Sequence, residues 1–272
     1  MLRRSRVLST TALAFAAVIA LAGCSAGATE PAADASTDAS AVALVTDGTL
    51  TVATEGTYRP SSFHEDGTGP LVGYDVEVAE AVADKLGLEI VFQETQWDAI
   101  FAGLEAKRFD VIANQVSITP EREEVYAFSA PYAVSPGVIV VKDNDDSISS
   151  FDDLAGKTTA QSLTSNWFAL AEESGANVEG VEGWAQAVAL LEQGRVDATI
   201  NDKLTFLDYE TTNPDAAIKI AAETDDVSNS AFAATKDNAA LAEAITGALD
   251  ELRTDGTLTT IGEKYFGTDI SE

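Results

Sequence analysis

The sequence predicts an α/β fold of two similar lobes with a ligand cleft between them. From residue 50 onward, apolar segments of strand length alternate with segments whose apolar residues recur at helical spacing. This alternation is typical of α/β folds with mostly parallel sheets. It runs through one series and then through a second, similar series. The apolar strands Val138–Val141 and Ser230–Ala234 are the expected connections between the lobes, and two strands joining two lobes make a hinge.

The first series begins at the apolar strand Leu50–Thr54. A helix is expected at Tyr74–Leu86, because its apolar residues recur at helical spacing and Gly87 follows as a stop signal. The remaining elements expected in this series are strands at Glu89–Phe92 and Asp110–Ala113 and helices at Trp97–Glu105 and from Pro120 onward.

The second series predicts a matching set of elements. Its strands are expected at Lys157–Ala160, Val178–Val181, Asp197–Ile200 and Ala217–Ala221, and its helices at Trp167–Glu173, Trp184–Gln193 and Lys203–Thr211. Two closing helices, Ala239–Arg253 and Leu258–Phe266, are expected to return to the first lobe. We therefore expect residues 48–137 plus 233–272 to form lobe 1 and residues 138–232 to form lobe 2.

The N-terminus has the features of a secretory leader. Arg3, Arg4 and Arg6 precede the apolar stretch Thr10–Leu21, which is too short for a permanent membrane span. The stretch ends at Leu21-Ala22-Gly23-Cys24, which resembles the lipobox of bacterial lipoproteins. We expect residues 1–23 to be a lipoprotein signal peptide, Cys24 to be lipidated and residues 24–47 to be a flexible tether. The alternative is an ordinary secretory leader that happens to contain a cysteine.

Composition excludes several classes of function. The net charge is −29, and subtracting the three leader arginines gives −29 − 3 = −32. Such a surface repels nucleic acid, so no nucleic-acid partner is expected. Cys24 is the single cysteine and His64 the single histidine, which excludes a disulfide framework, a zinc site and a His-based triad. We expect no cofactor, and although carboxylates alone can bind a metal, no EF-hand spacing is present.

The run DVIANQVSITPER, from Asp110 to Arg122, is the most informative segment. It passes from an apolar strand through polar residues into a helix, with Thr119 as the expected N-cap and Pro120 as the first helical residue. Arg122 then lies in the first turn, at the positive end of the helix dipole. An anion held by this arginine and by free N–H groups would offset that cost, so the segment indicates a carboxylate site.

Several motifs along the chain together resemble one family. From Leu50 to Ser271 the sequence is similar to the polar amino-acid solute-binding proteins of bacterial ABC importers, solute-binding family 3. The motifs are Glu55–Pro60, Gly73–Gly87, Ser117–Arg122, Phe128–Tyr132, Asp152–Lys157, Gly194–Ala198, Asp255–Leu258 and Glu263–Gly267. The resemblance implies a type II periplasmic-binding-protein-like fold, binding without catalysis, and hence no catalytic residue.

The family's ligand contacts match positions of this chain. The resemblance implies that Arg122 grips the ligand α-carboxylate and that Ser117 and Thr164 support the same end. It implies that Asp202 receives the α-ammonium. The aromatic residues expected to enclose the ligand side chain are Tyr58 and Trp97. Two of these residues also have structural readings, since Asp202 is well placed for a helix N-cap and Trp97 for a core position.

Finer similarity points to the cystine-binding branch of the family. Glu55, the Asn114-Gln115 pair and the run Gln161–Asn166 look like that branch, and the two amides could meet a second polar group on the ligand. Ser61-Ser62 departs from the more apolar pair usual after the proline. We therefore expect a polar amino acid as ligand, with cystine or a related sulfur amino acid favoured.

The expected partners follow from this resemblance. They are the free amino acid, the transmembrane subunits of an ABC permease and the membrane itself through the lipid on Cys24. The chain is expected to be a monomer at the outer face of the cytoplasmic membrane. Two alternatives stay open from the sequence: a ligand-sensing subunit for a membrane signalling partner, and a lyase built on the same fold. For a lyase, Glu55 would be the candidate carboxylate.

Overall fold

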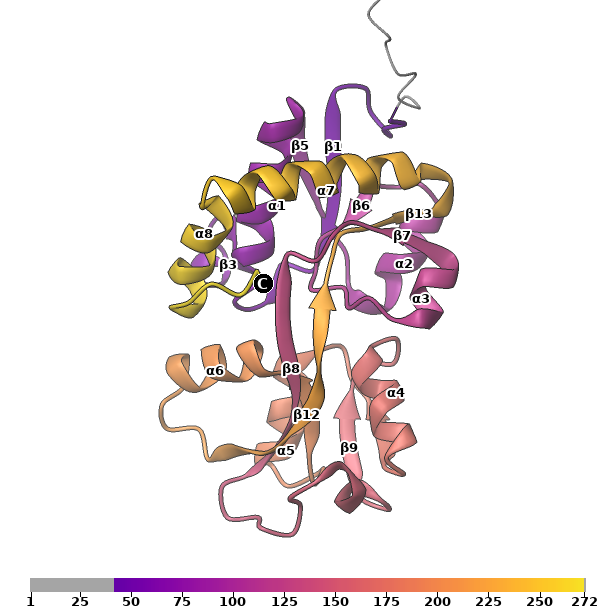
Figure 1. Ribbon diagram of the computed structural model, residues 1–272. Coiled ribbons are helices and arrows are strands. Elements are labelled where there is room, and N and C mark those ends of the chain that lie inside the picture. The colour runs from indigo at the N-terminus through magenta and orange to yellow at the C-terminus, as the bar shows by residue number, and fades with distance from the viewer. Residues whose placement is uncertain (1–41, 272) are drawn as a thin grey trace, which may run out of the picture. The chain divides into compact units, whose positions relative to one another are not determined.

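The computed structural model describes residues 42–271. The expected signal peptide, Cys24 and most of the expected tether lie outside this range. Within it the chain forms two lobes joined by two long strands, β8 (Ala133–Lys142) and β12 (Ile218–Ser230), as Figure 1 shows. The expectation of an α/β fold with two lobes and two connecting strands is therefore confirmed.

The first lobe is built on a five-stranded sheet. Its order is β5-β1-β6-β13-β7, with β1 parallel to β5 and β6, and β13 antiparallel to β6 and β7. The strands are β1 (Thr49–Thr54), β5 (Glu89–Glu94), β6 (Val111–Ile112), β7 (Tyr126–Phe128) and β13 (Ala233–Thr235).

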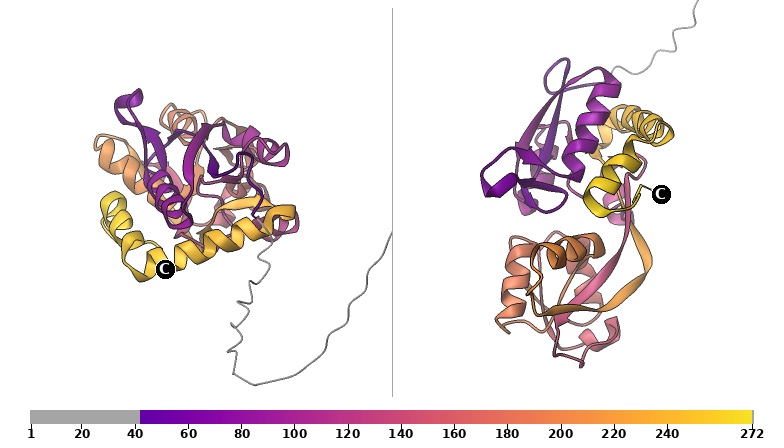
Figure 2. Two further views of the ribbon diagram at one scale, coloured as in Figure 1. Left: turned by 90° about the horizontal axis from the view of Figure 1, so that it is seen from above. Right: turned by 90° about the vertical axis from the view of Figure 1, so that its left-hand side faces the viewer.

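Helices cover both faces of this sheet because alternate strand residues point to opposite sides. Val52 and Val111 belong to the core formed with α1 (Tyr74–Leu86), α7 (Ala239–Thr254) and α8 (Thr257–Phe266). Their neighbours in sequence, Ala53 and Ile112, belong to the core formed with α2 (Trp97–Glu105). Figure 2 shows α7 and α8, in yellow, beside the first lobe, as expected from the sequence.

The second lobe contains two small sheets. One has the order β11-β8-β12 and is antiparallel, and the other pairs β9 with β10 in parallel. The other elements of this lobe are β9 (Thr158–Gln161), β10 (Asn177–Gly180), β11 (Thr199–Asp202), α4 (Asn166–Glu173), α5 (Trp184–Glu192) and α6 (Lys203–Thr212). The expectation of mostly parallel sheets is wrong for this lobe, because β8 enters it and β12 leaves it, so the two run in opposite directions.

The second connecting strand lies earlier in the chain than expected. The strand β12 continues without a break from the expected strand Ala217–Ala221 to Ser230, whereas Ser230–Ala234 contributes mainly β13 of the first sheet. Residues 222–229 are mostly polar and lack apolar alternation. Pairing with β8, interrupted by two irregularities in register, supplies their backbone hydrogen bonds instead.

Short elements complete the two lobes. The sequence did not predict the three-stranded sheet β2-β3-β4, which consists of β2 (Thr57–Tyr58), β3 (Ser62–His64) and β4 (Leu71–Val72). The predicted helix start is confirmed, because Thr119 caps α3 (Pro120–Val125) and its hydroxyl accepts from the Arg122 N–H at 3.3 Å. Single 3₁₀ turns, η1, η2 and η3, occur at Glu65–Gly67, Phe151–Leu154 and Lys236–Asn238.

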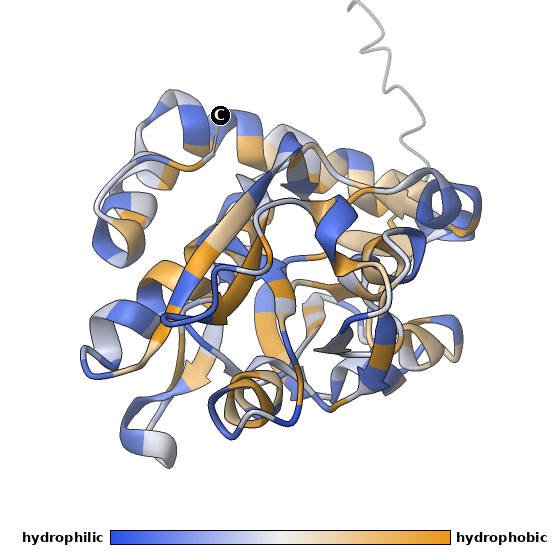
Figure 3. Cartoon of the chain, turned by 90° about the horizontal axis from the view of Figure 1, so that it is seen from below, coloured by the Kyte–Doolittle hydropathy of each residue, from blue (hydrophilic) through white to orange (hydrophobic). Residues whose placement is uncertain are grey.

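Hydropathy follows the layers. Figure 3 shows apolar colour along strands and on parts of the helices, with many loops polar. The central residues of β8 alternate between two cores of the second lobe, Val138 and Val140 in one, Ile139 and Val141 in the other. No helix formed by residues 42–271 is both long and apolar enough for a membrane crossing.

A buried aspartate anchors the first strand, and its removal is predicted to destabilise the protein. The Asp110 carboxylate accepts the N–H of Val45 at 2.6 Å and of Thr51 at 2.7 Å. Asp110→Ala leaves these donors unpaired, so the free energy of unfolding should fall by about 2–4 kcal/mol in urea titrations. Asp237→Ala, which removes an exposed partner of Lys107, is the control and should change it little. Equal losses in the two variants would contradict this role.

Candidate functional site

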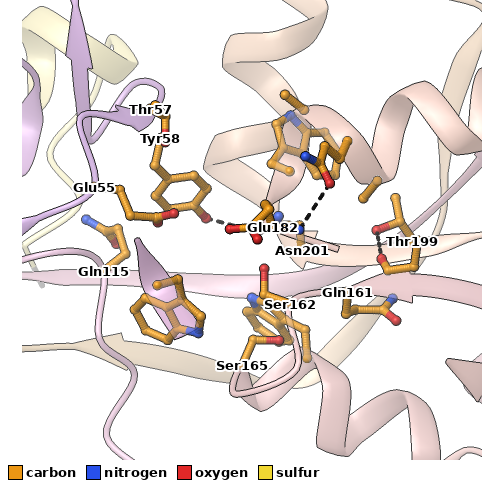
Figure 4. Close-up of a pocket in the computed structure, with 18 of the residues that line it drawn as sticks. Glu55, Thr57, Tyr58, Gln115, Gln161, Ser162, Ser165, Glu182, Thr199 and Asn201 are labelled. Atoms are coloured by element: carbon orange, nitrogen blue, oxygen red, sulfur yellow. Dashed lines mark hydrogen bonds between the residues drawn. The ribbon is translucent and has the colours of Figure 1, made fainter. Parts of the chain in front are cut away.

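A pocket of about 310 Å³ lies between the two lobes, and we call it the cleft pocket. Segments of both lobes form its wall, as the close-up in Figure 4 shows. The first lobe contributes Glu55, Thr57, Tyr58, Gln96, Trp97, Asn114 and Gln115. The second lobe contributes Ala160, Gln161, Ser162, Ser165, Asn166, Trp167, residues 182–187, Thr199, Ile200 and Asn201. Most of these residues lie near the ends of strands or in the first turns of helices, and α/β proteins bind ligands at the carboxyl ends of strands.

The structure brings five of the nine predicted ligand contacts to the cleft pocket. They are Glu55, Tyr58, Trp97, Asn114 and Gln115. Ser117 instead lines a second, more open hollow beside β12. Arg122, Thr164 and Asp202 line neither cavity, although hydrogen bonds join Arg122 to Ser117 and Thr164.

Glu55 and Asn114 form one hydrogen-bonded unit on the first-lobe wall. Asn114 Nδ2 donates to Glu55 Oε2 at 2.8 Å, while Asn114 Oδ1 accepts the Glu55 N–H at 2.8 Å and the Thr54 hydroxyl at 3.0 Å. Burial raises the pKa of Glu55 from 4.5 to about 7, against the lowering effect of Asn114. The pocket therefore contains a carboxyl group whose ionised form a nearby cation would stabilise.

Tyr58 connects the lobes across the pocket. Its hydroxyl donates to Asn201 Oδ1 at 2.9 Å and accepts from the Thr205 hydroxyl at 2.9 Å, and both partners belong to the second lobe. Burial also raises the pKa of Tyr58 above its ordinary value, so it stays a neutral donor. Trp97, 8% exposed, packs edge-on against Phe101 and lines the pocket as well, so it serves the core and the site together.

Arg122 lies at the edge where the lobes meet. Its Nη1 donates to the Ser117 carbonyl at 2.9 Å and its Nη2 donates to the Thr164 carbonyl at 3.1 Å. The guanidinium carbon is 5.5 Å from the centroid of the Trp97 ring, within cation–π range. Desolvation lowers the pKa of Arg122 to about 10. The cation thus has neutral carbonyl partners, and a carboxylate would be a stronger partner than either.

Asp202 is a helix cap, as its alternative reading expected. Its Oδ1 accepts the Leu204 N–H at 2.9 Å and the Ser135 hydroxyl at 2.7 Å. It is 6% exposed, and burial raises its pKa from 3.8 to about 6. Its neighbour Asn201 lines the cleft pocket, so the carboxylate lies directly behind the wall.

Gln115 has an unusual backbone. Its φ is +50°, in the left-handed region that side chains other than glycine seldom adopt. The buried carboxylate of Asp75 accepts its N–H at 2.7 Å and its side-chain Nε2 at 2.5 Å. Burial raises the pKa of Asp75 from 3.8 to about 7.

Sequence reasoning missed part of the second-lobe wall. Trp184 packs with the second-lobe core and also lines the pocket. Glu182 was not singled out, yet it and Glu55 are the charged residues of the lining, which contains no lysine or arginine among the described residues. Asn201 and Gln161 lie in the last residues of β11 and β9, the end of a strand at which α/β proteins bind ligands.

Metal binding finds no support in the described part of the chain. Between residues 42 and 271, no group of three or more histidine, cysteine, aspartate or glutamate side chains is placed to hold a metal ion. The cleft pocket offers a mixture of aromatic surface, amides and carboxyl groups, which suits a polar organic ligand that carries an ammonium group.

The two-lobe fold with a polar cleft defines this chain as a solute-binding protein. It belongs to the bacterial extracellular solute-binding proteins, family 3, whose model matches residues 50–268. It is therefore a binding protein, in a family of solute-binding proteins and not of enzymes.

Two relatives in sequence are particularly similar. The L-cystine-binding protein TcyA of Bacillus subtilis (strain 168) is 48% identical over 256 residues, covering 94% of this chain and 95% of that protein. A probable amino-acid ABC transporter-binding protein of Haemophilus influenzae is 52% identical over 224 residues, covering 82% of this chain and 87% of that protein.

Solved structures add information on the lobes. The L-cystine solute receptor of Neisseria gonorrhoeae, in the unliganded open conformation, is 48% identical with a TM-score of 0.56, covering 83% of this chain and 95% of that one. An ancestral arginine-binding protein bound to arginine is only 38% identical but has a TM-score of 0.76. The match covers 81% of this chain and 99% of that one. The present structure is thus more similar overall to the arginine-bound relative than to the unliganded cystine receptor.

The raised pKa of Glu55 predicts a pH-dependent cost to stability. The Glu55 carboxyl group binds its proton more tightly in the folded protein than in the unfolded chain. The free energy of unfolding therefore falls as the pH rises from 4.5 to about 7. Glu55→Gln removes this cost, so the ligand-free variant should melt on the order of 5 °C above the wild type at pH 8. The difference should vanish near pH 4.5, as followed by scanning calorimetry.

The matched control is Glu89→Gln, which changes an exposed carboxylate on β5. It should leave the melting temperature unchanged at both pH values. A Glu55→Gln variant that melts below the wild type at pH 8 would show that the ionised carboxylate is stabilising, contrary to this account.

Proposed function

We propose that this chain is a lipid-anchored, extracytoplasmic protein that captures L-cystine, or a related sulfur amino acid, and delivers it to an ABC permease. The observation that supports cystine as the ligand is the similarity to TcyA, which extends over 94% of this chain. The cleft pocket agrees with it, because it is polar and has carboxyl groups on both lobes. The cystine receptor of N. gonorrhoeae supports the same assignment at the same identity.

The α-amino-acid end of the ligand is proposed to bind between Arg122 and Asp202. Arg122 exchanges a carbonyl partner for the ligand carboxylate, with the Ser117 and Thr164 segments, already its neighbours, on either side. Asp202 accepts the ammonium beside Asn201. Each buried ion then has a counter-ion, which removes the penalty of isolated buried charge.

The remainder of the ligand is proposed to extend between Tyr58 and Trp97 toward Glu55. Cystine carries a second amino-acid group at its far end, so it requires polar partners at both ends of the pocket. Glu55 and Asn114 supply a carboxylate and an amide there. A ligand with only one ammonium group would leave Glu55 without a counter-ion.

Closure and delivery follow from the two-lobe build. Because the proposed partners come from both lobes, ligand favours the closed arrangement, which a permease can distinguish from the open one. We propose residues 48–137 plus 233–272 and residues 138–232 as the moving bodies. The lipid on Cys24 and the tether through residue 47 would keep the lobes, as a monomer, at the outer face of the cytoplasmic membrane.

Titration calorimetry tests the function on the secreted domain without residues 1–24. L-cystine should bind with a dissociation constant of about 1 μM or tighter, near −8 kcal/mol, and L-glutamate, L-glutamine and L-arginine should bind more weakly. Arg122→Ala and Asp202→Asn should each weaken binding at least about 100-fold, because each leaves a ligand charge unpaired.

Arg195→Ala and Asp215→Asn, which change exposed charges of the second lobe, are the controls and should bind as the wild type does. If another amino acid binds more tightly, with the same losses in both site variants, cystine is not the ligand but the chain is still an amino-acid-binding protein. Binding that survives both site variants would discard the proposed placement of the ligand.

A further inference from the structure

We propose that Asp75 is a positioning residue that turns Gln115 into a hydrogen-bond acceptor for a ligand ammonium group. This inference rests on the proposed function, because it needs a ligand with an ammonium group in the cleft pocket. Asp75 itself is fully buried and does not line the pocket, whereas Gln115 does.

The polarity of the Gln115 amide is set by Asp75. Nε2 donates to Asp75 Oδ1 at 2.5 Å, which commits the nitrogen to the interior. Oε1 accepts no hydrogen bond from residues 42–271 and is not among the buried, unpartnered atoms, so it is the accessible end of the amide. An amide held this way presents an acceptor and suits a donor such as an ammonium group.

Asp75 also holds the strained backbone of Gln115. The left-handed φ of +50° is unfavourable for a residue with a side chain. The charge-assisted bond from the Gln115 N–H to Asp75 Oδ2, 2.7 Å long, offsets that cost. Because both oxygens of one carboxylate bind one residue, the backbone and the side chain are fixed together.

Asp75 is itself firmly placed at the start of α1. Its N–H donates to the Ser61 carbonyl at 2.9 Å. The preceding Gly73 passes so close to this carbonyl that a Cβ there would lie 2.2 Å from the oxygen. The turn that presents Asp75 is therefore pinned to the loop before β3, and the carboxylate has little freedom to move.

The charge of Asp75 lacks a cation in the described chain. None of the ion pairs formed within residues 42–271 includes it. The ionisable groups that act on it are the hydroxyl of Tyr132, which donates to it, and Asp202, which repels it, while it in turn raises the pKa of Tyr74 and Tyr58. An ammonium group between Asp202 and Gln115 would attract both carboxylates at once.

Isothermal titration with L-cystine at pH 8 tests this role in a double-mutant cycle. Asp75→Asn puts an amide nitrogen against Gln115 Nε2, so the Gln115 amide must turn and present a donor. Binding should weaken about 10- to 30-fold, and Gln115→Ala should weaken it about 10-fold. The double variant Asp75→Asn/Gln115→Ala should bind L-cystine at least as tightly as the single variant with the lower affinity, because Asp75 acts through Gln115.

A charge-conserving exchange separates positioning from a merely structural role. In Asp75→Asn/Gln115→Glu, the new amide donates to the new carboxylate, and the other carboxylate oxygen remains an acceptor toward the pocket. Binding should return to within about 3-fold of the wild type. Additive losses in the cycle, wild-type affinity in Asp75→Asn, or no recovery in the exchange variant would each overturn the proposal.

Two further measurements on ligand-free protein keep this test independent of the proposed function. Burial raises the pKa of Asp75 to about 7, so the neutral isostere should not lower the melting temperature at pH 8. The Gln115 side-chain NH₂ protons should exchange slowly with solvent in the wild type and rapidly in Asp75→Asn. Equal exchange rates in the two proteins would overturn the Asp75–Gln115 link, whether or not an amino acid binds. Failure of every amino acid to bind, with the difference in exchange present, would count against the proposed function alone.

Discussion

Burial of carboxyl groups without cations at the cleft is the constraint on which the site depends. Burial raises the pKa values of Glu55 and Asp75 to about 7 and of Asp202 to about 6. None of the three forms an ion pair within residues 42–271. Such a site is costly without a counter-ion and favourable with one, so the protein is built to bind a ligand that carries ammonium groups.

The fold delivers these groups to one place because they follow strands or begin helices. Glu55 comes after β1, Asn114 and Gln115 after β6, and Asp202 ends β11. The long strands β8 and β12 carry the second lobe opposite the first, and Tyr58 bridges the two. Under the proposed function, charge pairing with the ligand accompanies lobe closure, and a membrane partner can distinguish the closed arrangement from the open one.

Local signals in the sequence were enough for much of the fold, whereas the first-lobe wall was predicted from the resemblance to the family. The helices Tyr74–Leu86 and Trp97–Glu105 have the predicted bounds, because apolar spacing and terminal residues agree there. The course of β12 was missed, since tertiary pairing alone orders its polar residues. The contact between Asp75 and Gln115 joins segments 40 residues apart, and no local pattern reveals that Gln115 adopts a left-handed φ.

The central claim is that cleft carboxyl groups become ionised when the ligand's ammonium groups arrive, and proton release on binding measures this directly. L-cystine would be titrated at pH 6.5 in buffers of different ionisation enthalpy. Because an ammonium group lowers the pKa of each neighbouring carboxyl, from about 7 for Glu55 and Asp75 and about 6 for Asp202, binding should release protons. Binding with no net release, or with proton uptake, would contradict the account.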